Sequence, residues 1–214
     1  MVRPASVVAD NKPVRVANAA PVVQRIGVAV VRHGDFKSKF YRIPGLARSR
    51  KGTLLAVYDI RYNHSGDLPA NIDVGVSRST DGGRTWSDVK IAIDDSKIAP
   101  SLGATRGVGD PAILVDEKTG RIWVAAIWSH RHSIWGSKSG DNSPEACGQL
   151  VLAYSDNDGL TWSRPINITE QTKNKDWRIL FNGPGNGICM KDGTLVFAAQ
   201  YWDGKGVPWS TIVY

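Results

Sequence analysis

The sequence predicts an all-β protein that is built from repeated small sheets. An octet with the pattern Ser-x-[Asp/Asn]-x-Gly-x-Thr-Trp occurs twice, at residues 79–86 and 155–162. Each octet follows a stretch in which apolar residues alternate with others, which is typical of a strand that runs into a tight turn. No stretch keeps the 3.6-residue periodicity of a helix beyond a turn or two. A β-propeller is the architecture that repeated sheets of this kind favour.

The octet itself is best interpreted as the fastener of a hairpin. Its Asp or Asn side chain can bind the backbone two residues further on, and its Gly can adopt a positive φ. The Trp then begins the next strand and packs over the turn. The octets therefore indicate the fold, and the chemistry has to lie elsewhere.

Composition and charge exclude several classes of protein. The 214 residues are 42% hydrophobic and 22% charged, as in an ordinary globular protein. There is no run of about 18 apolar residues, so no membrane span is predicted. The net charge of +7 favours anionic substrates or surfaces. The basic residues are scattered and form no basic–aromatic recognition motif, so we do not expect a nucleic-acid partner.

The cysteines and histidines do not indicate a metal or a cofactor. Cys147 and Cys189 lack the CxxC spacing of metal and redox motifs, and both a disulfide and two buried thiols remain open. Of the four histidines, His130 and His132 would lie on one face of a strand, but no third ligand is evident. We therefore expect no metal site and no cofactor.

Taken in order, the chain begins with a segment that has no regular pattern. Residues 1–24 are rich in Ala, Val and Pro and lack the continuous apolar core of a signal peptide. They are interpreted as an extended arm or as the remnant of a processed leader. The apolar stretch at residues 26–31 predicts a first strand, and the remaining residues, 25–214, are expected to form one domain.

Three similar strands then recur along the chain. The stretches 52–58, 120–126 and 193–199 each start with a glycine in a turn and continue as an apolar strand. They are about 70 residues apart, as are the two octets. The stretches 72–77 and 150–154 alternate and lead into the octets. The sequence thus predicts three units, each a small antiparallel sheet.

The third unit stops where its last hairpin should turn. The strand pattern of Thr211–Val213 is followed by Tyr214, and a third octet is expected at the next position. Propellers close with about 4–8 blades, so three units would leave unpaired edges. The expectation is therefore that the chain covers about half of a propeller.

Three places offer polar groups that a site at the strand ends could use. Arg42, between Tyr41 and Ile43-Pro44, can present a fixed guanidinium to a carboxylate, or can belong to a surface ion pair. Arg61 and Asp67 share one loop after an apolar strand, where a carboxylate is a charge partner or a general acid. Asp110, between Gly109 and Pro111, is a turn residue or points into a cleft.

At these residues the sequence resembles the exo-α-sialidases, the bacterial retaining glycosidases and above all the enzymes of gut Bacteroidetes. The resemblance rests on Tyr41-Arg42-Ile43-Pro44, the loop with Arg61 and Asp67, and the two octets, which are the Asp boxes of that family. It covers residues 26–214. It implies a six-bladed propeller that hydrolyses terminal α-linked sialic acids of glycans with retention, without a cofactor. Members of the family are mostly secreted or periplasmic.

The resemblance also implies roles for individual residues. Arg42 matches the first arginine of a triad that binds the carboxylate of sialic acid. Arg61 matches an arginine that contacts the glycerol, O4 or N-acetyl side of the sugar. Asp67 matches the acid/base that protonates the leaving oxygen and later activates water. Asp110 matches an aspartate near the O4 and N-acetyl groups.

The match is looser for two tryptophans and absent for the rest of the catalytic site. Trp128 and Trp135 are expected either to wall the N-acetyl pocket or to pack in the core. The family also uses a Tyr nucleophile, its Glu partner and two more arginines, and none of these has a matching motif here. The isolated chain is therefore expected to be inactive, and a second chain or a C-terminal half would complete the propeller.

Two other functions are compatible with the same residues. A sialoglycan-binding propeller could use Arg42 and Arg61 without doing chemistry, but it would have no need for an acid at Asp67. A trans-sialidase shares the whole site with the hydrolases and differs in its acceptor site.

Overall fold

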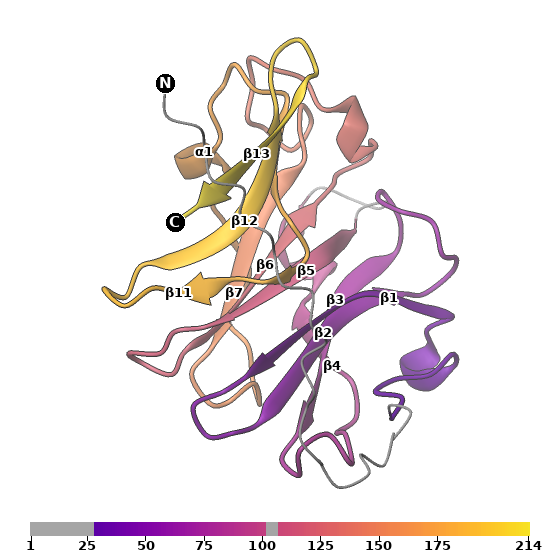
Figure 1. The fold of residues 1–214 in the computed structure, drawn as a ribbon. Helices are drawn as coiled ribbons and strands as arrows, with labels where there is room; N and C mark the ends of the chain where they lie inside the picture. Colours follow the sequence, from indigo (N-terminus) through magenta and orange to yellow (C-terminus); the bar gives the residue numbers. More distant parts are fainter. Residues whose placement is uncertain (1–27, 102–106) are drawn as a thin grey trace, which may run out of the picture.

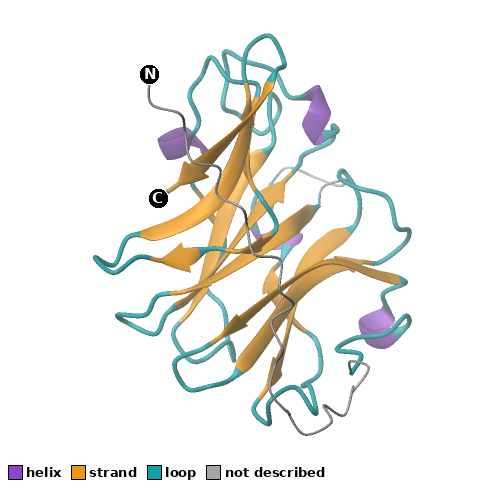
Figure 2. Cartoon of the chain, viewed as in Figure 1, coloured by secondary structure: helices purple, strands orange, loops and turns teal. Residues whose placement is uncertain are grey.

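The described residues form three mainly antiparallel sheets that lie side by side. The computed structural model describes residues 28–101 and 107–214. In Figure 1 the N-terminal sheet and the C-terminal sheet lie at opposite ends, with the second sheet between them. Figure 2 shows strands joined by loops, with only short helical segments. The predicted all-β fold of three small sheets is confirmed.

The first sheet has the strand order β1-β2-β3-β4, with every neighbouring pair antiparallel. Its strands are β1 (Phe40–Arg48), β2 (Leu54–Arg61), β3 (Ile72–Ser79) and β4 (Lys90–Ile93). The second sheet has the order β10-β5-β6-β7-β8. Its strands are β5 (Val108–Val115), β6 (Ile122–Trp128), β7 (Gln149–Ser155), β8 (Ile166–Asn167) and β10 (Gly185–Asn186).

The third sheet is centred on β12, which pairs with β9, β11 and β13. Its strands are β9 (Ile179–Asn182), β11 (Ile188–Cys189), β12 (Leu195–Trp202) and β13 (Pro208–Val213). The helical segments are short. They are the 3-10 turns η1 (Asp35–Lys37), η2 (Asp95–Lys97) and η3 (Ile134–Gly136) and the single-turn helix α1 (Thr169–Thr172).

The largest part of the core lies between the first and second sheets. Apolar side chains of β2 and β3, such as Leu55 and Val74, face those of β5 and β6, such as Ile113 and Val124. These four side chains are fully buried. A sheet buried on both faces carries nearly continuous apolar runs, which explains the stretches that the sequence pattern identified as strands.

Both octets fold as tight turns, but the Asp or Asn binds the backbone three or four residues further on instead of two. The Trp does not begin the next strand, since β4 begins at Lys90 and β8 at Ile166. Asp81 accepts hydrogen bonds from the backbone N–H groups of Arg84 and Thr85, each at 3.0 Å, and from the Thr85 hydroxyl at 2.7 Å. In the second octet, Asn157 accepts from the Thr161 N–H at 2.9 Å and donates to the Thr161 hydroxyl oxygen at 2.8 Å. Asn therefore replaces Asp by reversing one side-chain hydrogen bond.

Some expectations need correction. Residues 28–31 are not a strand, so the predicted strand at 26–31 is wrong in its described part, and the first strand begins at Phe40. The second sheet is not purely antiparallel, because β10 runs parallel to β5. The two cysteines are free thiols, Cys147 buried and Cys189 partly exposed. The segment 1–24 lies outside the described residues, and the domain boundary at residue 25 stays a prediction.

An irregularity recurs where the first strand of a sheet meets a proline. The register of β1 shifts between Arg42 and Gly45, and that of β5 shifts between Gly109 and Ala112. Proline cannot donate to the ladder, which explains why both bulges contain one. The residues before the prolines, Ile43 and Asp110, have φ of 56° and 55°. These values are unusual for residues other than glycine and cost energy, a combination that is frequent at functional sites.

Candidate active site

The two bulges and the loop after β2 enclose a small cavity of about 170 Å³. Five of the six predicted site residues lie on its wall. The lining residues are Arg42, Ile43, Asp59, Arg61, Asp67, Leu68, Gly109, Asp110, Ile134 and Trp135. The first and second sheets both contribute, so the cavity exists only when these sheets are packed together.

The floor of the cavity is a buried ion pair. The Arg61 Nη2 and Nε atoms donate to Asp59 Oδ2 at 2.7 and 3.0 Å. The side chains of Arg61 and Asp59 are 2% and 0% exposed. A guanidinium that makes these bonds inside the protein has one fixed orientation, because leaving its partner unpaired would be costly.

The rim of the cavity carries a second, exposed pair. Arg42 Nη1 lies 3.3 Å from Asp67 Oδ1, and these side chains are 46% and 71% exposed. Arg42 also donates to the Ser65 carbonyl oxygen at 2.9 Å. Arg61 Nη1 donates to the same Asp67 oxygen at 2.8 Å. Asp67 is thus held by one buried and one exposed arginine, both of which contact Oδ1.

Asp110 reaches the cavity because of the bulge in β5. Its N–H donates to Asp59 Oδ1 at 2.9 Å, and its carbonyl oxygen accepts from Asn182 Nδ2 at 2.7 Å. A Cβ at the neighbouring Gly109 would lie 3.0 Å from Asp59 Oδ1, so a larger residue there would press against this carboxylate. The backbone at Asp110 is therefore fixed from both sides, by the first sheet and by the third.

Burial raises the pKa values of two carboxyl groups in the cavity, those of Asp59 and Asp110. Burial raises the pKa of Asp59 to about 7, although the hydrogen bonds from Arg61 act in the opposite direction. Burial also raises the pKa of Asp110, against the attraction of Arg61. Burial alone would lower the pKa of Arg61, but its hydrogen bonds to Asp67 and Asp59 raise it, so this side chain stays charged.

The two predicted tryptophans have different positions. Trp135 lines the cavity, is 51% exposed and stacks on Trp202 with ring centroids 5.0 Å apart. Trp128 is fully buried in the core between the first and second sheets, and its Nε1 donates to Asp95 Oδ1 at 2.8 Å. Of the two alternatives for Trp128, the structure shows core packing.

Two residues of the site were not singled out from the sequence. Asp59 is the partner of Arg61, and Asn182 fixes the backbone of Asp110. Asp59 could have been found, because residues two apart in a strand share one face and Asp59 precedes Arg61 by two. Asn182 comes from the next sheet, and no pattern in the sequence connects it with Asp110.

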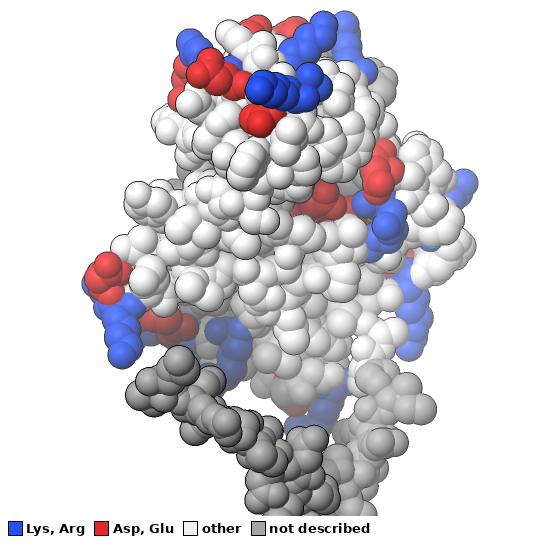
Figure 3. Space-filling view, turned by 45° about the horizontal axis from the view of Figure 1, so that its top comes forward, with Lys and Arg blue, Asp and Glu red and all other residues white. Residues whose placement is uncertain are grey.

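Charged side chains are unevenly spread over the face of the molecule that Figure 3 draws. Figure 3 shows acidic and basic side chains side by side at a few places, with a broad uncharged area beside them. Among the described residues, no group of three His, Cys, Asp or Glu side chains is placed to hold a metal ion. None of the described helices has the length and apolar character needed to cross a membrane.

The arrangement can hold an anionic ligand beside a carboxyl group. Arg42 offers an exposed guanidinium, Asp67 an exposed carboxyl group, and Trp135 an apolar wall. The propeller-type fold of antiparallel sheets, the two Asp boxes and this cavity place the chain in the class of Asp-box proteins. The BNR repeat-like domain family matches residues 43–214, and the chain belongs to this family.

The similar proteins are sialidases. The chain is 47% identical to a sialidase of Bacteroides fragilis, over 98% of this chain and 40% of the relative. It is 35% identical to a sialidase of Clostridium perfringens, over 77% of this chain and 42% of that protein. The resemblance to sialidases predicted from the sequence is confirmed. The chain spans about two fifths of the length of these relatives.

Solved structures agree with this assignment. The Hadza microbial sialidase Hz136 superposes with a TM-score of 0.83 at 49% identity, covering 88% of this chain and 37% of that one. The intramolecular trans-sialidase from Ruminococcus gnavus gives a TM-score of 0.68 at 18% identity, covering 86% and 62%. The latter identity is so low that it supports the fold alone.

Proposed function

We propose that this chain forms the N-terminal part of an exo-α-sialidase with a six-bladed propeller. The parent protein would hydrolyse terminal α-linked sialic acids of glycans with retention of configuration. The observation that carries this proposal is the cavity in which Arg42 and Arg61 both contact the exposed Asp67. The similarity to sialidases over nearly the whole chain supports it.

Arg42 is proposed to bind the carboxylate of the substrate. Its guanidinium is half-exposed, and its contact with Asp67 is the longer of the two that Asp67 makes with arginines. A substrate carboxylate can therefore replace Asp67 as the partner of Arg42 without breaking a buried interaction. Charge-assisted bonds between a guanidinium and a carboxylate are short and directional, so this contact would also orient the sugar.

Asp67 is proposed to act as the general acid and base. Arg61 holds Oδ1, whereas Oδ2 receives no hydrogen bond from the described residues and is accessible. That oxygen can protonate the leaving glycosidic oxygen and later accept a proton from water. Arg61 is too deeply buried to move, so it fixes the position of the acid.

Asp110 and Trp135 would bind the side of the sugar that faces away from the leaving group. Asp110 offers a carboxyl group to hydroxyl or amide donors, and Trp135 offers an apolar surface to an N-acetyl methyl group. Tyr and Glu are absent from the described residues that line the cavity. A nucleophile and its base would therefore come from another part of the propeller, as would further arginines.

The test is a hydrolysis assay on the protein encoded by the complete reading frame. We expect release of sialic acid from an aryl α-sialoside, with the α-anomer detected first by NMR. Asp67→Asn should lower kcat by about 10²–10⁴-fold, the contribution of a positioned acid. The matched control is Asp156→Asn, because Asp156 is also exposed and paired with an arginine, Arg121, but lies outside the cavity.

The outcomes separate the proposal from its alternatives. Saturable binding of sialoglycans with no turnover would show a binding module and contradict the proposal. Transfer of sialic acid to an added sugar acceptor, in preference to water, would show a trans-sialidase instead. An Asp67→Asn variant as active as the unchanged protein would contradict the role of Asp67 even if the enzyme is a sialidase.

A further inference from the structure

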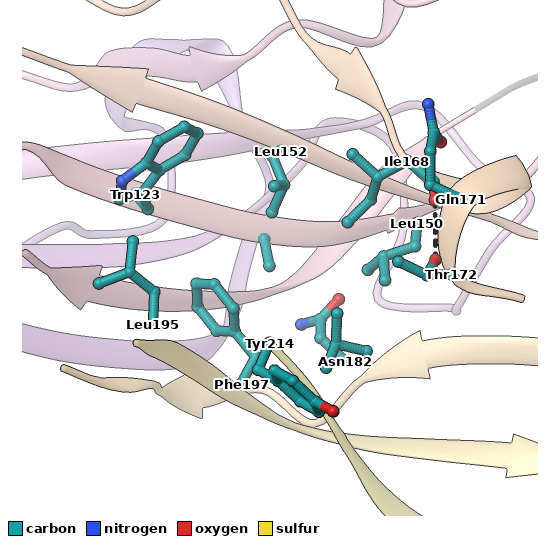
Figure 4. Close-up of a pocket in the computed structure, with 12 residues that line it drawn as sticks. Trp123, Leu150, Leu152, Ile168, Gln171, Thr172, Asn182, Leu195, Phe197 and Tyr214 are labelled. Carbon is teal, nitrogen blue, oxygen red and sulfur yellow. Dashed lines mark hydrogen bonds between the residues drawn. The ribbon is translucent and has the colours of Figure 1, made fainter. Parts of the chain in front are cut away.

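The candidate active site differs from the apolar cavity between the second and third sheets in what encloses it. The apolar cavity, of about 240 Å³, is lined mainly by side chains of β6, β7, β12 and α1 (Figure 4). One side of the candidate active site is instead the loop 62–71, which carries Asp67 and joins β2 to β3. The backbone of a strand is fixed by its ladder, whereas a loop relies on hydrogen bonds of its own. The bonds within this loop therefore decide where the carboxyl group of Asp67 lies.

Two arginines that line the cavity hold this loop. Arg61 Nη1 donates to the carbonyl oxygens of Ser65 and Gly66 at 2.7 and 2.9 Å. Arg42 Nη1 donates to the same Ser65 oxygen at 2.9 Å. The two residues before Asp67 thus present their carbonyl oxygens to the guanidinium groups that also contact its carboxylate.

His64 holds the same part of the loop through an N–H group. The Gly66 N–H donates to His64 Nδ1 at 3.1 Å. The Ser65 carbonyl and the Gly66 N–H belong to one peptide bond, which is planar, so partners for both groups leave it a single orientation. Nδ1 can accept this bond only when it carries no proton, which places the proton of the ring on Nε2. The ring also lies close to the backbone, since a Cβ at Gly66 would be 2.9 Å from Nδ1.

The bond from Gly66 to His64 limits the motion of a permissive residue. Glycine has the widest choice of backbone angles, and the Gly66 N–H makes no other hydrogen bond to the described residues. Without the acceptor on His64, the peptide can rotate and turn the Ser65 carbonyl away from both arginines. A substrate that engages Arg42 competes with Ser65 for this arginine, so the bond to His64 matters most when substrate is bound.

We propose that His64 is a positioning residue for Asp67. Its Nδ1 keeps the Ser65–Gly66 peptide in the orientation in which the arginines hold the loop, and so keeps the carboxyl group of Asp67 at the wall of the cavity. His64 acts through the loop and needs no contact with the substrate. This inference rests on the proposed role of Asp67 as general acid and base.

The first measurement is sialidase kinetics of the protein encoded by the complete reading frame. His64→Ala should lower kcat about three- to tenfold, the effect of one hydrogen bond, with KM nearly unchanged because both arginines remain. His64→Asn should restore kcat, since an Asn oxygen accepts the N–H two residues further on. Asn174 makes this bond to the Asp176 N–H at 2.9 Å, outside the cavity. Asn174→Ala is therefore the matched control and should leave kcat unchanged.

The second measurement is NMR of the 214-residue chain, which does not depend on turnover. We expect the Gly66 amide to exchange with D₂O several-fold faster in His64→Ala, and at the original rate in His64→Asn. We also expect the proton of the His64 ring on Nε2. An unchanged protein without sialidase activity would contradict the proposed function alone, because the amide exchange and the ring proton test the loop separately.

Three results would overturn the role of His64. The first is a ring proton on Nδ1, since the bond from the Gly66 N–H could not then exist. The second is faster amide exchange in His64→Ala without a loss of kcat, which would show that the loop does not position Asp67. The third is a loss of kcat without faster exchange, or one that His64→Asn does not restore, which would show that His64 acts on the substrate directly.

Discussion

At the scale of single residues, the candidate site depends on Asp59, a fully buried side chain. One of its oxygens receives both bonds from Arg61, and the other accepts the N–H of Asp110. Asp59 therefore connects the arginine that holds Asp67 with the bulge that presents Asp110. We infer that it is a positioning residue whose loss would disturb both sides of the cavity.

Removal of Asp59 should destabilise the protein strongly. In Asp59→Ala, Arg61 keeps its charge in a buried position without its main partner, a situation that costs about 3–5 kcal/mol. The measurement is the unfolding free energy in urea at pH 8, above the pKa of about 7 at which Asp59 titrates. Asp156→Ala is the control, because its contact with Arg121 has the same 2.7 Å distance but is exposed. Equal losses in the two variants would contradict the role of burial.

The residues of the site were predictable where one segment contains the whole motif. Arg42, Arg61 and Asp67 could be placed from the sequence because they lie in or beside two neighbouring strands, β1 and β2. Trp128 could not, since alternation places a side chain on a face of a strand but does not say whether that face meets a cavity or another sheet. Asn182 was missed because its contact with Asp110 depends on how two sheets pack.

At the scale of elements, the Asp boxes show how one turn tolerates two residue types. Asp81 and Asn157 both accept backbone N–H groups through one oxygen. They differ at the second atom, where Asp81 accepts from a threonine hydroxyl and Asn157 donates to one. The hydroxyl can rotate to serve either role, which explains why the sequence varies here without a change of turn.

The difference between a carboxylate at Asp81 and an amide at Asn157 predicts how the melting temperature depends on pH. Hydrogen bonds from Thr85 and Ser79 lower the pKa of Asp81 well below its usual range. A carboxylate with a lowered pKa in the folded state stabilises the protein above its unfolded pKa of about 4 and loses this effect as the pH falls. Asp81→Asn should therefore weaken the fall of the melting temperature between pH 5 and pH 2.5, while leaving it nearly unchanged at pH 7.

The control for this prediction is Asp81→Ala. It removes every hydrogen bond of the side chain and should lower the melting temperature by a few degrees at pH 7. Thermal unfolding followed by circular dichroism at both pH values distinguishes the variants. If Asp81→Asn and Asp81→Ala are equally unstable at pH 7, the equivalence of Asp and Asn in the turn is wrong.

Most strands, but not their irregularities, could be predicted from the sequence. The predicted stretches 52–58, 120–126 and 193–199 each begin two residues before β2, β6 and β12 and otherwise lie inside these strands. The wrong strand at 26–31 has an apolar run but no neighbour to pair with in its described part, and pairing is a tertiary property. The bulges at Ile43 and Asp110 were not foreseen, because a proline after a strand residue is compatible with a turn, an edge or a bulge.

At the scale of the whole molecule, the first and second sheets are joined by a side chain of the second Asp box as well as by the core. Asp158, in the second box, accepts Arg78 Nη2 and the Thr53 hydroxyl, each at 2.6 Å. Both partners belong to the first sheet or its turn. Asp158 has a φ of 64°, and the first box has Gly82, with a φ of 75°, at the same position.

The variant Asp158→Gly therefore tests how much the contacts of Asp158 with Arg78 and Thr53 contribute to the junction between the first and second sheets. Glycine accepts the backbone angle, so the variant removes only the side-chain contacts. We expect a loss of about 1–3 kcal/mol at pH 7, as for hydrogen bonds to a charged group. Burial would raise the pKa of Asp158, but the bonds from Thr53 and Arg78 lower it, so the loss should shrink below about pH 4.

The readout is urea unfolding combined with hydrogen exchange of the amides of β3 and β7. Faster exchange confined to the junction would support a local role of Asp158. Gly82→Ala is a useful comparison, because it strains the same backbone position in the first box without touching a second sheet. An Asp158→Gly variant as stable as the unchanged chain at pH 7 would show that apolar packing alone joins the sheets.

The short strand β10 affects the order in which the contacts of the protein form during synthesis. It pairs with β5 of the second sheet, and Asn186 Nδ2 donates to the carbonyl oxygen of Leu46, which is 140 residues earlier in the sequence. During synthesis the first two sheets can form from the emerging chain, but this contact has to wait for Asn186. Because long-range contacts form slowly, this connection between the first and second sheets would form after the other strands of both sheets. The bond from Asn182 that fixes the far side of the cavity between the bulges likewise depends on a residue that follows the first two sheets in the chain.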